Sequence, residues 1–210
     1  MSGLPRYAEP VVGFDLDMTL VDTSAAMMVA VRAVNRELGV AVDVDACVRA
    51  MGSPQRQQLA GAVPAEKLDA AMSVLARAFL TEGLDLVRPL DGAGDLLAEL
   101  AAAGGRAVVV TTRRTRSASA CLRRCGLLVA YTCGGLSTDG KVAALQGLRA
   151  ASYVGDHPLD MAAATGAGVA GIGVTTGFHD AAALTAAGAA VVFGGLAEVL
   201  RGHQHRTMLA

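Results

Sequence analysis

The sequence predicts an α/β protein, in which a parallel β-sheet has helices on both faces and is interrupted near its start by an inserted group of helices. From residue 89 onward, short apolar runs alternate with segments of helical periodicity, an order that implies right-handed crossovers and a parallel sheet. Residues 24–88 instead carry helical patterns without a strong strand pattern. We therefore expect a core domain of residues 1–21 and 89–210 and a helical cap domain of residues 22–88.

The first expected strand ends in two carboxylates. Residues 11–14 (VVGF) suit a buried strand, and Asp15 and Asp17 follow at once. Alternate residues of an extended strand face the same side, so these two carboxylates should point together. Two like charges this close are costly unless a cation lies between them or one is protonated. The plain alternative is a solvated turn.

The inserted region shows two apolar stripes at helical spacing. The first ends at Gly39, a residue type that commonly terminates helices, and comprises Met27, Val31, Val34 and Leu38. The second is more typical of a packing surface than of a catalytic site and comprises Leu68, Met72, Leu75 and Phe79. Between them, Ser53 and Pro54 form a suitable N-cap and first-turn pair.

The remaining elements follow in alternation. Helices are expected over residues 91–103, 115–124, 141–149, 159–165 and 181–187. Strands are expected over residues 106–111, 151–154, 169–174 and 190–193, with a short apolar stretch around 127–132. The residues from about 202 are expected to be a frayed tail.

Polar residues gather where three of these strands end. In parallel sheets, functional loops lie at the carboxyl ends of the strands. This rule brings together Asp15 with Asp17, Thr111 with Thr112, and Gly155 with Asp156.

Two further charged residues join this group. Positive charge comes from 16 arginines and only two lysines, Lys67 and Lys141, and this bias predicts that a lysine is kept where a compact ammonium is needed. In GDHPLD, Asp160 follows Asp156 at a spacing of four, which faces both acids the same way if a helix begins at His157.

Several carboxylates without thiolate or histidine partners favour a hard cation such as Mg²⁺. An aspartate that approaches a phosphoryl dianion is opposed by roughly 4 kcal/mol per charge pair at about 4 Å and an effective dielectric of about 20. Mg²⁺ and Lys141 can reverse that repulsion, and Thr111 with backbone N–H groups can hold phosphoryl oxygens. The cluster therefore indicates phosphoryl chemistry.

These motifs resemble those of the haloacid dehalogenase-like hydrolase superfamily, specifically its helical-cap phosphatases of the phosphoglycolate phosphatase type. The matching stretches are DLDMT at 15–19, VVVTT at 108–112, Lys141 and GDHPLD at 155–160. They occur in the family's order and span nearly the whole core. The resemblance implies a Rossmann-like core, Mg²⁺ as cofactor and a small phosphorylated metabolite as substrate. The segment from Lys141 to Gly155 is shorter than in typical phosphoglycolate phosphatases, and this weakens the assignment to that activity.

By this resemblance, Asp15 is the nucleophile that forms an aspartyl-phosphate. Asp17 protonates the leaving oxygen, then activates water, and offers its backbone carbonyl to the metal. Dehalogenases of the superfamily lack this second aspartate, so its presence favours phosphoryl transfer.

The resemblance also implies the binding residues. Thr111 and Lys141 contact the phosphate, and Lys141 also neutralises the nucleophile. Thr112 adjoins the phosphate where many relatives carry Asn, so its contact is expected to differ. Asp156 is a Mg²⁺ ligand, and Asp160 supports the metal directly or through an intermediary.

Several alternatives stay open. A phosphosugar mutase would use the same motifs, and a phosphonate hydrolase would need a cap lysine, for which Lys67 is the candidate. A receiver-type phosphoacceptor switch is disfavoured by the large insert and by the late GDHPLD motif. Candidates for substrate contacts beyond the phosphate are Gly52, Arg56, Arg113, Arg114 and His179.

Bulk properties bound the partners and the compartment. A net charge of −1 disfavours nucleic-acid binding. The first ten residues lack an apolar signal region, and the longest uncharged run, residues 161–178, is too rich in Gly and Thr for a membrane span. The four cysteines lack metal-like spacing with histidines and fit a reducing cytosol. We expect a cytoplasmic protein with no nucleic-acid or membrane partner, and the oligomeric state stays open.

Overall fold

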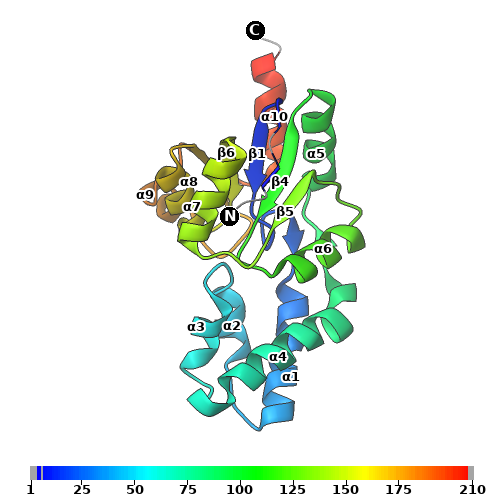
Figure 1. Cartoon of the computed structure of the whole chain (residues 1–210), viewed down its shortest axis with the longest axis vertical. Helices are drawn as coiled ribbons and strands as arrows, with labels where there is room; N and C mark the ends of the chain where they lie inside the picture. The colour runs from blue at the N-terminus through cyan, green and yellow to red at the C-terminus, as the bar shows by residue number, and fades with distance from the viewer. Residues whose placement is uncertain (1–3, 6, 208–210) are drawn as a thin grey trace.

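The computed structural model describes residues 4, 5 and 7–207, the last five of them by their backbone alone, and contains the predicted parallel sheet (Figure 1). Six strands pair in the order β5-β4-β1-β6-β7-β8, all in parallel. Their bounds are β1 Val11–Phe14, β4 Arg106–Val110, β5 Tyr131–Cys133, β6 Ala150–Gly155, β7 Ala170–Val174 and β8 Val191–Phe193. The expected strand pattern is confirmed, and the short apolar stretch near residue 130 supplies the edge strand β5.

Six helices cover the two faces of the sheet. One face packs against α5, α6 and α10, and the other against α7, α8 and α9. The helix bounds are α5 Ala93–Ala102, α6 Thr115–Arg124, α7 Thr138–Leu148, α8 Pro158–Ala167, α9 Ala181–Ala186 and α10 Leu196–Thr207. Because both faces are covered, the strands consist largely of aliphatic residues, without strict alternation of apolar and polar positions.

The segment between β1 and β4 is the predicted helical insert. It contains α1 Ser24–Leu38, α2 Val44–Arg49, α3 Gln55–Ala60 and α4 Leu68–Ala78, with short turns at Ala65–Lys67, Phe79–Gly83 and Leu84–Leu86. The apolar stripe of α1 is buried except for the partly buried Leu38, and Gly39 ends that helix in the left-handed conformation at φ 61°. The four helices lie together at the end of the sheet where its strands terminate (Figure 1).

A two-stranded antiparallel ribbon joins the insert to the core. It pairs β2 (Val21–Asp22) with β3 (Arg88–Pro89), in the register Val21 to Pro89 and Asp22 to Arg88. No strand pattern is visible in the sequence at these positions, because each strand is two residues long. The ribbon brings both chain crossings of the insert to one place.

Two local expectations were wrong. Ser53 was expected to cap α3 with its side chain, but Pro54 is the N-cap residue and the cap has no side-chain hydrogen bond. The expected tail from Gly202 is helical up to Thr207, because α10 begins at the fully buried Leu196 and continues as one helix. Its polar end concealed this continuation in the sequence. Residues 208–210 of that expected tail, and residues 1–3 and 6 of the expected signal-free start, lie outside the described part of the chain.

Within the described residues, no helix combines the length and the hydropathy that a membrane crossing requires.

The loop after β4 is held closely by the loop after β5. Gly135 N–H donates to the Arg113 carbonyl at 2.8 Å, and Leu136 N–H donates to the Thr111 carbonyl at 3.2 Å. A Cβ placed on Gly134 would lie 2.4 Å from the Arg113 carbonyl oxygen and 2.5 Å from the Thr115 backbone nitrogen. Only glycine fits at this position, because the opposing atoms belong to backbone and have no rotamers with which to move away.

We expect Gly134→Ala to destabilise the protein by about 1–3 kcal/mol, the usual cost of overpacking. The matched control is Gly94→Ala in α5, where an added Cβ meets nothing within 4 Å. That change should leave stability unchanged or slightly raised, since alanine favours helices. Urea unfolding of both variants measures the difference, and equal midpoints would contradict the proposed clash.

Candidate active site

The residues after β1 form a tight loop that presents two aspartates. Asp15 N–H donates to the Val154 carbonyl at 2.8 Å and so extends the pairing of β1 with β6. The Leu16 carbonyl then accepts from Leu20 N–H at 2.9 Å and from Val21 N–H at 3.1 Å. Met18 sits at the turn with φ 59°, a left-handed conformation that is rare for a non-glycine residue. The backbone therefore reverses its direction within five residues, and the side chains of Asp15 and Asp17 contact different groups.

Lys141 lies at the centre of the charged cluster. It comes from the first turn of α7, whose N-cap is Ser137, and its side chain is buried. Its Nζ lies 2.9 Å from Asp15 Oδ1 and 2.6 Å from Asp160 Oδ1. The nearby carboxylates raise the pKa of Lys141 well above its ordinary value despite burial, which keeps the ammonium charged. The other lysine, Lys67, is exposed, and its Nζ donates to the Leu38 carbonyl.

Three carboxylates converge beside Lys141. Each of Asp15, Asp156 and Asp160 offers an oxygen, and these oxygens lie within 4.8 Å of one another. Burial raises the pKa of Asp15 to about 7, against the opposing effect of Lys141. Burial likewise raises the pKa of Asp156 well above its ordinary value. One ammonium does not balance three buried carboxylates, so the donor set fits a metal ion.

Asp160 and Asp156 differ in how many hydrogen bonds the protein already makes to them. Asp160 accepts from Lys141 and from His157 N–H at 3.2 Å, and its Oδ1 lies 3.1 Å from the Tyr153 hydroxyl, which also lies 2.6 Å from the Val110 carbonyl. Asp156 accepts from the Thr19 hydroxyl at 2.8 Å through Oδ1, while its Oδ2 lies over Gly177, where a Cβ would clash. Asp156 therefore keeps more of its lone pairs available for a cation than Asp160.

Asp17 does not join this carboxylate cluster. Its two oxygens lie 2.9 and 2.8 Å from Arg113 Nε, and the Thr23 hydroxyl donates to Oδ1. The expectation that Asp15 and Asp17 point together is therefore only partly met. Asp17 is close enough for its charge to contribute to the raised pKa of Asp15, but its carboxylate is held by other groups.

The two threonines after β4 differ in burial. Thr111 is fully buried, its backbone N–H donates to the Cys133 carbonyl at 2.9 Å, and its hydroxyl accepts from Arg113 N–H at 3.2 Å. Thr112 is half-buried. Their expected contacts to a phosphate stay predictions.

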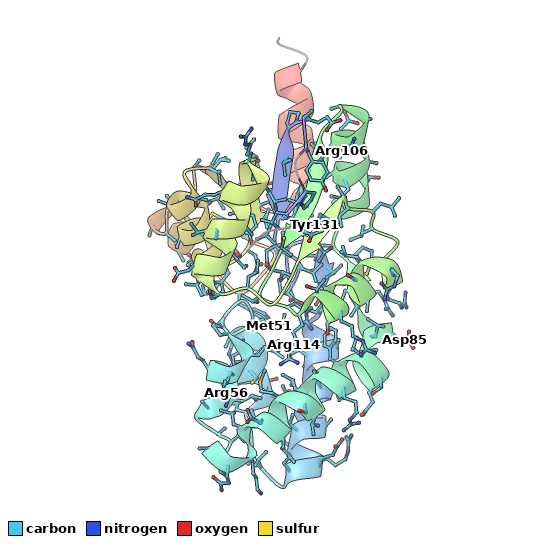
Figure 2. All side chains as sticks on the ribbon, viewed as in Figure 1. Met51, Arg56, Asp85, Arg106, Arg114 and Tyr131 are labelled. Carbon is cyan, nitrogen blue, oxygen red and sulfur yellow. The ribbon has the colours of Figure 1, made fainter. Side chains whose placement is uncertain are left out.

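The five candidates for further substrate contacts separate into groups. Gly52 of the insert lies against His157, since a Cβ on it would be 2.5 Å from the imidazole Cδ2, and His179 packs edge-on against that ring at 4.4 Å. Arg114 lies between the insert and the core, as does Met51, whereas Arg106 lies at the opposite end of β4 (Figure 2). Arg56 forms an exposed ion pair with Asp69 on the insert, and Arg113 contacts Asp17.

With this geometry in place, comparison with known proteins is informative. The family model for haloacid dehalogenase-like hydrolases matches residues 12–135, more than half of the chain. The chain belongs to the haloacid dehalogenase-like hydrolase family. The resemblance found in the sequence motifs is confirmed, and the six-stranded sheet with its helical insert is the fold of this family of hydrolases.

Individual relatives are more distant. Tyrosine-protein kinase PtkA of Mycobacterium tuberculosis is 29% identical over 138 residues, which cover 65% of this chain and 47% of that protein. The chain thus spans about half the length of the curated relatives that it matches.

Among solved structures, a haloacid dehalogenase-like family protein from Streptococcus pneumoniae superimposes with a TM-score of 0.82 at 24% identity, over 93% of this chain and 98% of that one. A predicted phosphoglycolate phosphatase from Haemophilus somnus gives a TM-score of 0.77 at 18% identity, over 92% and 97%. At these identities the likeness shows a shared fold.

Some supporting residues were not found from the sequence. Thr19 donates to Asp156 and Thr23 donates to Asp17. Both threonines follow Asp17 closely in the chain, but a threonine near an acid in a loop is too common to indicate such a contact. Tyr153 lies within the expected strand 151–154, and its hydroxyl donates to the Val110 carbonyl at 2.6 Å. The one indication in the sequence was a tyrosine within an apolar strand, because the hydroxyl of a buried tyrosine usually has a hydrogen-bond partner. Tyr153 is indeed fully buried.

We expect Lys141→Met to destabilise the protein by about 3–5 kcal/mol, because it leaves buried carboxylates without their cation. The loss should grow as pH rises, since ionisation of Asp15 then costs more without the ammonium. Lys67→Met is the matched control, because Lys67 is exposed. Thermal melts at acidic and alkaline pH compare the two, and a loss for Lys141→Met that shrinks with rising pH would contradict this electrostatic account.

Proposed function

We propose that the protein is a Mg²⁺-dependent phosphomonoester hydrolase that acts on a small phosphorylated metabolite through an aspartyl-phosphate. The carrying observation is the buried contact of 2.9 Å between Asp15 and the Lys141 ammonium, beside two further carboxylates. A carboxylate held next to a permanent cation can approach a phosphate dianion that it would otherwise repel. The family's hydrolase activity and the second aspartate, Asp17, agree with this proposal.

In the first step, a carboxylate oxygen of Asp15 attacks phosphorus and forms an acyl-phosphate as the ester P–O bond breaks. The Lys141 ammonium balances the charge of the phosphoryl group. Thr111, Thr112 and backbone N–H groups of their loop hold the phosphoryl oxygens. Asp17 delivers the proton that the leaving alkoxide needs.

In the second step, water attacks the phosphorus of the acyl-phosphate. Asp17, now a carboxylate, accepts the proton from this water, and the P–O bond to Asp15 breaks to regenerate the free side chain. One residue thus serves as acid and then as base, so the net reaction consumes water and releases an alcohol and phosphate.

Mg²⁺ fits the donor set, which consists of carboxylate oxygens. Asp15 and Asp156 would hold it with the Asp17 backbone carbonyl, and Asp160, already bound by Lys141 and by His157 N–H, would keep Lys141 in place. When bound, the ion supplies positive charge that offsets the charges of the nucleophile and the phosphate.

The insert fits the role of a cap domain with boundaries at residues 22 and 88. Its two crossings lie in the β2–β3 ribbon beside Asp17, and Gly52 contacts His157 next to Asp156. A unit attached in this way can exclude water from the reaction and contribute the residues that select the substrate.

A second candidate is phosphoryl transfer from ATP to a protein tyrosine, because the curated relatives are named tyrosine-protein kinases. The same Asp15 would carry the phosphoryl group, and a tyrosine hydroxyl would replace water. Incubation with radiolabelled ATP and a tyrosine-containing polymer separates the two candidates. A phosphosugar mutase would differ in returning its sugar in phosphorylated form. A phosphonate hydrolase would need a lysine at the substrate, and Lys67 is exposed and bonded to the Leu38 carbonyl, which gives that alternative no support.

We expect the wild-type protein to hydrolyse p-nitrophenyl phosphate and Asp15→Asn to lose this activity by about 10³-fold or more, because an amide cannot form the acyl-phosphate. Asp95→Asn in α5 is the control, since Asp95 is exposed on the core and should retain wild-type rates. Circular dichroism checks that both variants fold. A folded Asp15→Asn protein with wild-type turnover would show that the nucleophile lies elsewhere.

Activity should require Mg²⁺ and be abolished by excess EDTA. In the metal-free protein the pKa of Asp15, about 7, lies above its ordinary value of 3.8, so the folded state holds a proton that the unfolded state has lost. Stability should therefore fall as pH rises from about 4 to about 7. Metal binding requires the ionised form, so Mg²⁺ should raise the Tm more at about pH 8 than at about pH 5.5. Full activity in EDTA would contradict the metal assignment, as would an Asp156→Asn variant that keeps the Mg²⁺-dependent rise.

A further inference from the structure

Arg113 is a buried guanidinium that the proposed reaction leaves without a role. It follows the phosphate-binding threonines in the loop after β4, and its side chain is 5% exposed. Its Nε reaches both oxygens of Asp17, whose side chain is 10% exposed. Taking two charges out of water is costly and is offset here by their mutual contact, so the pair is a specific feature of the site.

The Arg113 guanidinium also contacts the insert. Its Cζ lies 3.9 Å from the centroid of the Phe79 ring, in a cation–π contact. Phe79 begins the turn that follows α4 and is itself buried. A continuous path of contacts therefore runs from the insert through Phe79 and Arg113 to the carboxylate of Asp17.

A second contact approaches Asp17 from the hinge. Thr23 directly follows β2, and its hydroxyl donates to Asp17 Oδ1. The carboxylate is thus bound on one side by a residue at the root of the insert and on the other by a residue that the insert packs against. Its orientation depends on where the insert lies.

We propose that Arg113 is a positioning residue, which fixes the orientation of the Asp17 carboxylate and links it, through Phe79, to the seating of the helical insert. This inference rests on the proposed phosphatase function and on the role of Asp17 as its acid and base. Proton transfer to the leaving oxygen is then fastest when the insert is packed against the core.

The contacts of Arg113 favour this role over direct binding of a substrate phosphate. Its Nε is committed to Asp17, one face of the guanidinium is covered by Phe79, and its backbone is held by Thr111 and Gly135.

The test compares two phosphate esters that differ in their need for a proton. Loss of a p-nitrophenolate requires little protonation, whereas loss of the alkoxide from glycerol 2-phosphate requires it strongly. The value of kcat/KM, which reports the steps up to loss of the alcohol, is measured for both esters in Mg²⁺ with wild type, Arg113→Met, Phe79→Leu and Asp17→Asn. Arg116→Met is the matched control, since this arginine is exposed on α6.

In Arg113→Met, kcat/KM for glycerol 2-phosphate should fall about 10-fold or more, and that for p-nitrophenyl phosphate less than about 3-fold, within the usual range of acid catalysis. The phosphorylated form of Asp15 should accumulate, because the same residue serves as base in the second step. Phe79→Leu should change the ratio of the two kcat/KM values in the same direction but by a smaller factor. This variant provides the test if Arg113→Met does not fold. Arg116→Met should match wild type.

A double-mutant cycle distinguishes positioning from other roles. In an Asp17→Asn background, Arg113→Met should cause no further loss, because its effect passes through Asp17. Equal losses for both esters, or a loss that multiplies with that of Asp17→Asn, would overturn the proposal while the phosphatase function stands. If Phe79→Leu leaves the ratio of the two kcat/KM values unchanged, the insert does not influence the orientation of Asp17 through Phe79. A wild-type protein that hydrolyses neither ester would instead refute the proposed function itself.

Discussion

The site depends on the balance between the Lys141 ammonium and the carboxylates around it. Asp15, Asp156 and Asp160 are each buried, and burial without compensation would drive such groups to hold protons. A single lysine lies against two of them, and the raised pKa values of Asp15 and Asp156 show that this compensation is incomplete. The charge that remains uncompensated makes these carboxylates a donor set that suits a cation.

Much of this could be predicted from sequence, because the governing pattern is local. Apolar runs that end in Asp15, in Thr111 and in Asp156 predict strand ends, and the geometry of a parallel sheet then brings those ends to one edge. The position of Lys141 followed from its rarity among arginines and from the order of the family motifs. No long-range information was needed for these residues, since the fold itself supplies the proximity.

The remainder could not be predicted, because it depends on contacts between segments that no local pattern relates. Arg113 and Asp17 are far apart in the chain, and nothing near either residue distinguishes an arginine that binds substrate from one that holds a carboxylate. The left-handed turn at Met18 directly follows Asp17, and methionine gives no indication of such a conformation. The polar end of α10 is helical because its first turn is anchored in the core, which its own sequence does not reveal.

The short ribbon of β2 and β3 has a consequence for how the molecule tolerates change. Asp22 and Arg88 are paired, so the chain leaves the core and returns to it at adjacent points. The insert, with its four helices, therefore takes the place of the loop that connects the two strands of a β-hairpin. The entropy of closing such a loop rises only slowly with its length, by about 0.6 kcal/mol for each doubling. Its contents can therefore be lengthened, shortened or exchanged at little cost to the sheet, provided that the two ends stay side by side.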